Sequence, residues 1–337
     1  MKQTGIPLAI SVMSIAAILL CVIVLARMIA YAPQTAVAPI QATSTITSTI
    51  TVTIGGDIMF DRRERALGEK NGYDSLLEGI APIFRAADIA VANLEGPITS
   101  STSLTLLSNG RMTSSLAFTF ATTTAEALAN AGIALVSLAN NHTDNFGRSG
   151  LEETHHWLDT AGMLWFGDPA NATSTEKIVC KKDICITFVG YNEFESGFEN
   201  IIADVRRLSG AGYPVIVMPH WGDEYAPTAQ DRVREKAHEL VAAGAFAIIG
   251  SHPHVIEDRE WIGDVPVIYS LGNLLFDQYF SPAVMMGNIA ELTISKDENG
   301  TRIDSVCLYT VSNASQKTKT LEPAGPVISG EPIEFTR

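Results

Sequence analysis

The sequence predicts an α/β fold in which short strands alternate with helices. Short apolar runs recur from residue 50 onward, and segments with helical periodicity separate most of them. Clusters of Asp, Asn, Glu and His follow these apolar runs directly, where open α/β sheets place their ligand-binding loops. These observations favour a single sheet-based domain with a binding site at the carboxyl ends of its strands.

The expected elements run in order along the chain. The last three strands follow one another without long helices between them. Strands are expected at residues 51–54, 89–92, 134–138, 178–190 (as a hairpin), 215–218, 246–249, 266–271, 287–294 and 303–311, and helices at residues 75–86, 124–131, 150–161, 200–208 and 230–243.

Composition narrows the possible partners. The chain has 337 residues, 46% of them hydrophobic and 18% charged, which is typical of a folded protein. Its net charge of −14 argues against nucleic acid, because phosphate backbones are bound by basic patches. An anionic substrate would need metal ions or a few well-placed arginines.

The N-terminal segment, residues 1–32, predicts a membrane anchor. Residues 6–26 carry no charged side chain, and this uncharged run is about as long as an α-helix that crosses a bilayer. A cleaved signal peptide is the alternative interpretation. Residues 33–50 are expected to form a flexible linker, and residues 313–337 a C-terminal tail. We expect a single-pass protein of the cell membrane with its folded domain, residues 51–312, outside the cytoplasm.

Four cysteines are too few for a disulfide scaffold. Cys180 and Cys185 flank a short turn between two apolar stretches, so they are spaced either to pair across a hairpin or to remain as free thiols.

The loops after the predicted strands carry metal-binding residue types. Carboxylates, an amide oxygen and imidazoles are donors that suit Mn²⁺, Fe²⁺ or Zn²⁺, and no thiolate accompanies them. His142 is suited to general acid catalysis, because a histidine pKa lies near neutrality. The candidate ligands of one or two ions are Asp57, Glu95, Asn141, His220, His252 and His254.

Three further residues are candidates for substrate contacts. Arg62 follows the first polar cluster, which contains Asp57. It either contacts an anionic substrate or is a solvated residue of a turn. Glu224 and Asn273 fall on loops of the same predicted site, as supporting or substrate-contacting residues.

Seven motifs follow one another along the chain: Gly56-Asp57-Ile58-Met59, Asn93-Leu94-Glu95, Asn140-Asn141-His142, Gly147 to Gly150-Leu151, His220-Trp221-Gly222-Asp223-Glu224-Tyr225, Gly250-Ser251-His252-Pro253-His254 and Ser270-Leu271-Gly272-Asn273. In this order they resemble the CapA family of capsule and poly-γ-glutamate synthesis proteins, within the calcineurin-like metallophosphoesterase superfamily. The resemblance covers residues 50–312 and implies a four-layer α/β/β/α sandwich on a membrane-bound, outward-facing protein.

The resemblance also implies roles for the ligands. Asp57 and His254 match ligands of a first metal, and Asn141, His220 and His252 match ligands of a second, while His142 matches the catalytic histidine. Two positions depart from the superfamily pattern: Glu95 stands where a bridging Asp is usual, and Met59 where a ligating histidine is usual. A thioether is a poor ligand for hard divalent ions.

Two functions follow from this resemblance. The first is a metal-dependent hydrolase or transferase that acts on poly-γ-glutamate, a similar anionic polymer, or a phosphorylated intermediate of its synthesis or export. The alternative is a non-catalytic scaffold that binds the polymer for synthase or export proteins, and the loss of a ligand at Met59 favours it.

Overall fold

The computed structural model describes residues 23, 27, 47–172, 176–313, 327–328 and 330–337. The chain divides into two units, Met1–Ser44 and Thr45–Arg337. Most of the predicted anchor and most of the predicted linker lie outside the described residues. Within the described part of the chain, no helix combines the length and apolar character that a membrane span requires. The account below concerns the second unit.

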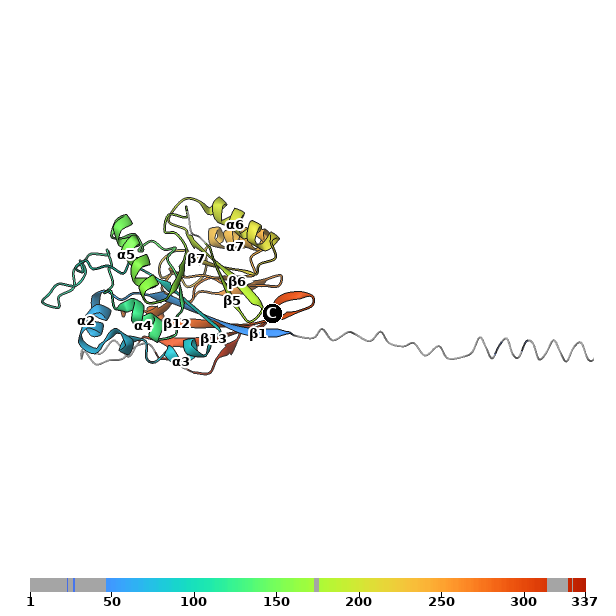
Figure 1. Ribbon diagram of the computed structural model, residues 1–337, viewed down its shortest axis with the longest axis horizontal. Helices are drawn as coiled ribbons and strands as arrows, with labels where there is room; N and C mark the ends of the chain where they lie inside the picture. The colour runs from blue at the N-terminus through green and yellow to red at the C-terminus, as the bar shows by residue number, and fades with distance from the viewer. Residues whose placement is uncertain (1–22, 24–26, 28–46, 173–175, 314–326, 329) are drawn as a thin grey trace, which may run out of the picture. The chain divides into compact units, whose positions relative to one another are not determined.

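A mixed nine-stranded sheet combines strands from the N-terminal and the C-terminal parts of the unit (Figure 1). Its main path runs β14-β13-β12-β1-β2-β3-β4, while β11 pairs with β1 and β15 with β13. Strands β1 to β4 and β11 run parallel to one another, whereas β12 pairs antiparallel with β1, and β13 pairs antiparallel with β12, β14 and β15. The strands are β1 (Ser48–Ile58), β2 (Ile89–Leu94), β3 (Leu135–Ser137), β4 (Leu164–Phe166), β11 (Asn273–Leu275), β12 (Met286–Asp297), β13 (Gly300–Ser312), β14 (Val327–Ile328) and β15 (Ile333–Glu334).

A second sheet of six strands has the order β5-β6-β7-β8-β10-β9. Strands β6, β7, β8 and β10 are parallel, and β5 and β9 form its antiparallel edges. The strands are β5 (Glu176–Lys181), β6 (Ile184–Asn192), β7 (Val215–His220), β8 (Ala247–Ile249), β9 (Arg259–Ile262) and β10 (Val265–Ile268).

Helices cover the outer faces of both sheets, which makes a four-layer sandwich. Figure 1 shows α6 and α7 together over β6 and β7, with α2 and α3 on the opposite side. The helices are α2 (Arg62–Asn71), α3 (Ala81–Ala86), α4 (Thr124–Asn130), α5 (Gly147–Thr160), α6 (Phe198–Gly210) and α7 (Asp231–Ala243), with 3-10 turns η1 (Tyr73–Leu76) and η2 (Ala283–Met285).

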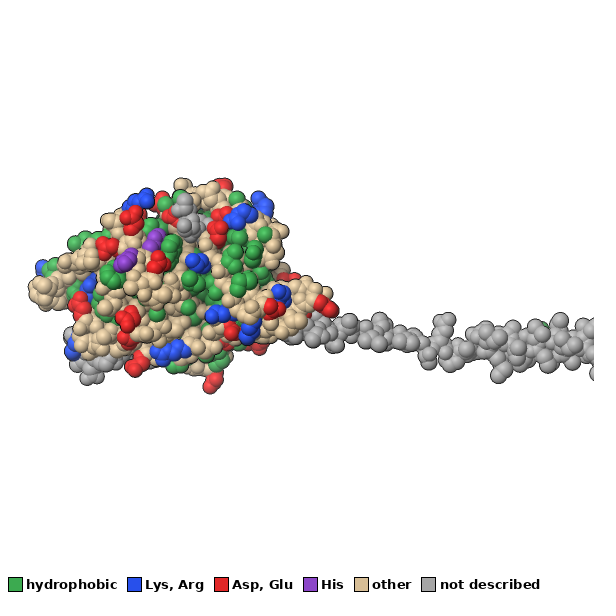
Figure 2. Space-filling model, in the orientation of Figure 1, with side chains coloured by type: hydrophobic (Ala, Val, Ile, Leu, Met, Phe, Trp, Pro, Cys, Tyr) green, Lys and Arg blue, Asp and Glu red, His purple; other side chains and the backbone are tan. Residues whose placement is uncertain are grey.

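Three apolar clusters hold these layers together. Residues such as Val52 and Phe188 form the core between the two sheets. Phe84 belongs to the cluster between the first sheet and helices α2 to α5, and Val205 to the cluster under α6 and α7. Burying apolar surface on both faces of each sheet is the dominant stabilising effect in such a sandwich. Around this core, acidic and basic side chains are interspersed on the face shown in Figure 2.

The structure adds the short strands β4, β9, β11, β14 and β15, which were not predicted, and it corrects two helical regions. The prediction of one helix over residues 75–86 was wrong, because the chain forms η1 and then starts again at α3, with Pro82 in its first turn. Proline lacks the backbone N–H that a helix interior needs, so it favours a helix start. Helix α2 was not predicted; Asp61 caps it by accepting a hydrogen bond from the Arg62 amide.

The hairpin of β5 and β6 resolves the choice left open for two cysteines. Cys180 and Cys185 are directly opposite each other in this antiparallel pair and form a disulfide. Cys307 is a free thiol on β13.

Candidate metal centre

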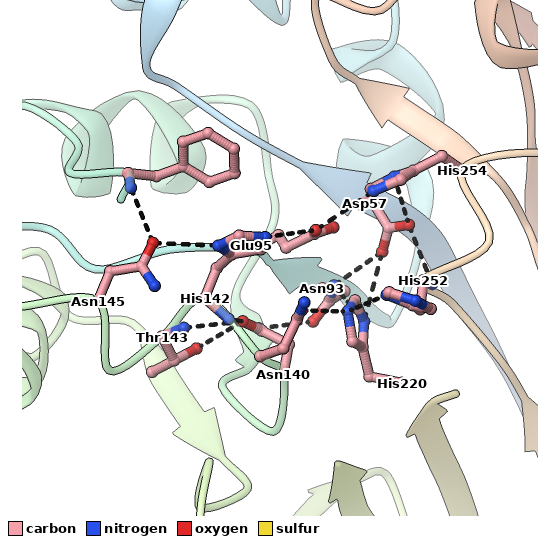
Figure 3. Close-up of polar contacts among 12 residues, drawn as sticks. Asp57, Asn93, Glu95, Asn140, His142, Thr143, Asn145, His220, His252 and His254 are labelled. Atoms are coloured by element: carbon pink, nitrogen blue, oxygen red, sulfur yellow. Dashed lines mark hydrogen bonds and ion pairs between the residues drawn. The ribbon is translucent and has the colours of Figure 1, made fainter. Parts of the chain in front are cut away.

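The site lies where the carboxyl ends of strands from both sheets meet. Asp57 is near the end of β1, Glu95 follows β2, and Asn141 follows β3, while His220 ends β7 and His254 lies in the loop after β8. Parallel strands deliver their following loops to one edge, so residues far apart in sequence converge there. Figure 3 shows the side chains pointing toward one another from these separate elements.

A close backbone approach places the first of these residues. Strand β1 lies beside the segment that leads into β11, and the Asp57 amide donates to the Gly272 carbonyl at 3.1 Å. A Cβ on Gly56 would lie 2.0 Å from that carbonyl oxygen. Only glycine fits at this position, because any side chain would clash with that carbonyl oxygen. The close approach brings the Asp57 carboxylate to the edge of the sheet.

Asp57, Glu95 and His254 form one compact group of buried donors. The His254 ring lies 3.5 Å from Asp57 through Nδ1 and 3.5 Å from Glu95 through Nε2. One donor atom from each residue lies within 4.8 Å of the others. Ligands of a divalent ion each lie about 2.0–2.2 Å from it, so this spacing is compatible with a shared ion.

Glu95 is the strongest indication that the group suits a metal. Its side chain is fully buried, and neither carboxylate oxygen has a hydrogen-bond partner in the described structure. Burial raises the pKa of Glu95 well above its usual range. Buried carboxylates are normally paired or bound to metal, because an isolated buried charge is costly. A divalent ion between Glu95, Asp57 and His254 would offset the buried negative charge and would give the Glu95 oxygens a partner.

The protonation of His254 reflects the same surroundings. Burial by itself lowers the pKa of His254, but the carboxylates of Glu95 and Asp57 outweigh burial and raise it to about 9. The imidazole therefore carries a proton at neutral pH when only these side chains surround it. A metal ion would have to displace that proton.

Asn141, His220 and His252 form a second group of donors beside the first. His220 Nε2 lies 2.9 Å from Asn141 Oδ1 and 3.1 Å from His252 Nδ1. Burial lowers the pKa of His220 well below its usual range and that of His252 to about 3. Both rings are consequently neutral, which is the form that binds metals.

Two asparagines that the sequence did not single out hold the ligands in place. Asn93 donates from Nδ2 to Asp57 Oδ1 at 2.7 Å, and the same atom lies 3.3 Å from His220 Nδ1. Asn140 donates to Asn93 Oδ1 at 3.1 Å and caps the loop by accepting from the His142 amide. Both lie next to predicted ligands in the sequence, but the direction in which their side chains point depends on the tertiary structure.

His142 faces the first donor group from the loop after β3. Its Nε2 lies 4.0 Å from Glu95 Oε1, and its Nδ1 lies 3.0 Å from Asn145 Oδ1. Because that oxygen also accepts from the Phe118 amide at 2.7 Å, the contact favours the tautomer with hydrogen on Nδ1. Burial lowers the pKa of His142.

The backbone that carries two of the histidines is strained. His252 has φ of 101° and His254 has φ of 59°, and neither is a glycine. Such conformations occur in a native structure only where the surroundings hold them, and they cluster at functional sites. In this conformation the His252 amide donates to Asp57 Oδ2 at 3.1 Å, and His254 Nδ1 lies 3.5 Å from the same oxygen.

Met59 does not contribute to either donor group. Its side chain is fully buried in the apolar cluster between the first sheet and its helices, and its sulfur accepts a hydrogen bond from the Asp61 amide at 2.9 Å. The first group therefore offers only Asp57, Glu95 and His254.

The three candidate substrate contacts occupy different positions. The Arg62 guanidinium lies 2.5 Å from Asp277 and over the rings of Phe118 and Phe276. Glu224 is exposed. Asn273 is fully buried, with its Oδ1 3.0 Å from His254 Nδ1, so it orients that ring.

Comparisons with known proteins agree with these features. The sequence profile of the bacterial capsule synthesis protein PGA_cap family matches residues 51–278. The chain is 28% identical over 251 residues to the PGA biosynthesis protein CapA of Bacillus subtilis (strain 168), covering 66% of this chain and 62% of that protein. It is 26% identical over 293 residues to the capsule biosynthesis protein CapA of Bacillus anthracis, covering 80% of this chain and 69% of that protein. The chain thus spans less than two thirds of the Bacillus subtilis relative.

A solved structure shares the fold. The calcineurin-like phosphoesterase YfkN of Bacillus subtilis superposes with a TM-score of 0.50 at 13% identity, covering 80% of this chain and 92% of that one. The architecture is thus the mixed α/β sandwich of calcineurin-like phosphoesterases, and the resemblance found in the sequence is confirmed. The chain belongs to the bacterial capsule synthesis protein PGA_cap family.

Proposed function

We propose that this protein is a membrane-anchored, metal-dependent hydrolase or transferase that acts on a capsule polymer or a phosphorylated intermediate of its synthesis. The observation that carries this proposal is the Glu95 carboxylate, fully buried and without a hydrogen-bond partner beside Asp57 and His254. The capsule-related role rests on the family and on the two CapA relatives.

Two ions can be assigned to residues. Asp57, Glu95 and His254 would hold the first, and Asn141, His220 and His252 the second, with Mn²⁺, Fe²⁺ or Zn²⁺ as the candidates. A bound ion of this kind supplies Lewis acidity and lowers the pKa of a water molecule.

The chain's own groups supply proton transfer and orientation. Asn145 holds His142 with its Nε2 toward Glu95, so a protonated His142 can donate from Nε2 to a leaving oxygen in the site. Asn273 orients His254. Arg62, Glu224 and Asn273 remain our proposed substrate-side residues; Glu224 is exposed, whereas the Arg62 guanidinium is paired with Asp277.

Membrane attachment is part of the proposal and rests on sequence. The uncharged run at residues 6–26 would anchor the chain, and residues 33–50 would link it to the folded unit on the outer side of the membrane. Polymer synthase or export proteins in the same membrane would be its partners.

Metal analysis tests the central claim. The full-length chain, purified and dialysed against each metal, should retain Mn²⁺, Fe²⁺ or Zn²⁺ with micromolar affinity and hydrolyse a phosphodiester such as bis(p-nitrophenyl) phosphate or cleave poly-γ-glutamate. The Glu95→Gln variant should do neither. A wild-type chain that binds none of the three metals would refute the proposal.

A non-catalytic scaffold is the second candidate, favoured by Met59. The first donor group has three side chains instead of four, because this residue packs in the core. A capsule-producing host that carries His142→Ala separates the two functions. Unchanged polymer output with this variant, together with loss of output on deleting residues 1–50, would support the scaffold.

A further inference from the structure

A hairpin loop, residues 99–117, carries a group of exposed aliphatic side chains. It lies between β2 and α4 and projects from the body as the blue-green segment at the left of Figure 1. Among the described residues, five large apolar side chains are more than half exposed: Leu104 at 53%, Met112 at 55%, Leu116 at 64%, Phe280 at 66% and Ile333 at 52%. Three of these five lie on the hairpin loop, which therefore concentrates exposed apolar surface at one place.

The hairpin loop has two different faces. Leu106 and Met112 form an antiparallel bridge, and because side chains alternate along a strand, Leu104 shares their face. Thr105 belongs to the opposite face and is fully buried against the body. The face with Leu104 and Met112 therefore points away from the body, toward solvent.

This conformation is built into the fold. The buried carboxylate of Asp61 bonds both ends of the loop: the Ser103 hydroxyl donates to Oδ1 at 2.7 Å, and the Thr119 amide donates to Oδ2 at 2.9 Å. Within the loop, the Thr113 amide donates to the Thr105 carbonyl at 2.8 Å. Backbone groups that are paired within the chain can enter an apolar environment at a lower cost than unpaired groups.

Charge distinguishes the hairpin loop from the rest of the chain. The chain has a net charge of −14, yet no acidic residue occurs between Glu95 and Glu126, and Arg111 is the single basic residue of that interval. An anionic surface would repel the acidic remainder of the protein but not this segment. The segment is thus well suited to approach a bilayer that contains anionic lipids.

The size and composition of the apolar face favour a bilayer over a protein partner. Three aliphatic side chains offer on the order of 200 Å² of apolar surface, whereas a stable protein interface buries about 800 Å² on each partner. The hairpin loop also contains no aromatic residue, although Trp and Tyr dominate the energetics of protein interfaces. A bilayer needs no matching surface, and a few inserted side chains suffice to orient a chain that is already anchored.

The proposed anchor can reach the same bilayer. The hairpin loop is bonded to Asp61, just beyond the carboxyl end of β1, whereas the chain enters β1 at its other end. Strand β1 has 11 residues, so these two points are roughly 36 Å apart. The 14 residues at positions 33–46 could span at most about 48 Å. This length lets the anchor and the hairpin loop lie in one membrane.

We propose that the hairpin loop inserts Leu104, Met112 and Leu116 into the surface of the bilayer to which the chain is anchored. This inference rests on the membrane attachment in the proposed function. The hairpin loop leads directly into Phe118, whose ring centroid lies 4.4 Å from that of His142. Insertion would therefore hold the metal centre beside the lipid head groups.

Tryptophan fluorescence tests the insertion. The full-length Met112→Trp chain is reconstituted in vesicles of phosphatidylcholine and phosphatidylglycerol, with dibromo-phosphatidylcholine as the quencher. We expect a blue-shifted emission and more quenching than in the wild type, whose four tryptophans supply the background. Adding Leu104→Ser and Leu116→Ser should lower the ratio of inserted to free hairpin loops by about tenfold or more. Adding Ile178→Ser instead is the matched control, since it removes an exposed aliphatic side chain of β5 and should leave the quenching unchanged.

The outcomes separate this inference from the proposed function. A chain that floats with the vesicles but shows no added quenching at Met112→Trp, or equal quenching with the two Ser substitutions, would overturn the inference alone. A blue shift in detergent that grows with protein concentration would assign the face to a second copy, and one that requires membranes of a capsule-producing host would assign it to a protein partner. Either result would also overturn the inference.

Two further measurements on the same samples test the proposed function. A full-length chain that does not float with vesicles would refute the proposed anchor and this inference with it. Absence of metal binding and of phosphodiester hydrolysis, with the quenching intact, would count against the proposed function alone.

Discussion

Replacing Glu95 by Gln distinguishes a metal ligand from an ordinary buried acid. The Glu95 side chain is fully buried beside His254, and no hydrogen bond to either of its oxygens is lost in the substitution. Glutamine has nearly the same size but lacks the charge that a divalent ion binds. We expect the variant to fold and to lose most of its stabilisation by metal.

The size of the effect follows from binding linkage. A ligand that binds only the native state stabilises it by RT ln(1 + [L]/Kd), which is about 2.7 kcal/mol at a concentration about 100 times Kd. If loss of the carboxylate weakens binding about 100-fold, the same concentration gives RT ln 2, about 0.4 kcal/mol. The wild type should therefore gain roughly 2 kcal/mol more than the variant, a difference of several degrees in Tm.

Thermal unfolding of the full-length chain with and without Mn²⁺, Fe²⁺ or Zn²⁺ measures this difference. Glu257→Gln is the matched control: Glu257 is also buried with both oxygens unpartnered, and its side chain has no described bond to the six candidate ligands. This control variant should show the same metal-induced increase in Tm as the wild type. The reasoning is refuted if Glu95→Gln is stabilised by metal as strongly as the wild type.

The other predictions concern protons, the disulfide and catalysis. Because the pKa of His254 is raised to about 9, its proton must leave when metal binds, so affinity should rise from about pH 7 to 9; calorimetry in buffers of different ionisation enthalpy counts the protons released, and a pH-independent affinity would contradict it. Burial raises the pKa of Glu64 to about 8, so the folded state binds more protons than the unfolded state above about pH 4.5. Stability should therefore fall by roughly 2 kcal/mol from about pH 6 to 8, and urea titrations of Glu64→Gln should show a flatter profile. Replacing Cys180 and Cys185 by Ser should lower the free energy of unfolding by about 2 kcal/mol in urea melts and leave metal content unchanged, whereas an altered metal content would show that the hairpin shapes the site. His142→Ala should reduce phosphodiester hydrolysis by about 100-fold or more at unchanged metal content, and an equal rate would exclude His142 as the general acid.

The order of strands and ligand-bearing loops was readable from the sequence. Each candidate ligand follows an apolar run, and the parallel arrangement of β1, β2 and β3, and of β7 and β8, brings those loops to one edge. The alternation of short apolar runs with helical patterns is a local property, so residue spacing alone was enough to predict an α/β fold. Breaks inside helices were harder to predict from the sequence, as the wrong prediction of one helix over residues 75–86 shows.

Orientation at the site was decided by the tertiary structure. The resemblance named Asn141 as a candidate ligand but gave no role to Asn140; in the structure Asn141 contacts His220, while Asn140 bonds to Asn93. Contacts between residues that are distant in the chain determine which way each side chain turns, and no local pattern encodes them. The same holds for Met59, whose sulfur turns into the core.

The sequence by itself therefore determined the family, the α/β class and the chemical types of the donors, because these depend on residue identity and spacing. Only the tertiary structure showed that the Glu95 carboxylate is buried with no hydrogen-bond partner among the described residues and that Cys180 is bonded to Cys185. Burial and pairing are collective results of packing two sheets together, and a single chain segment does not carry that information.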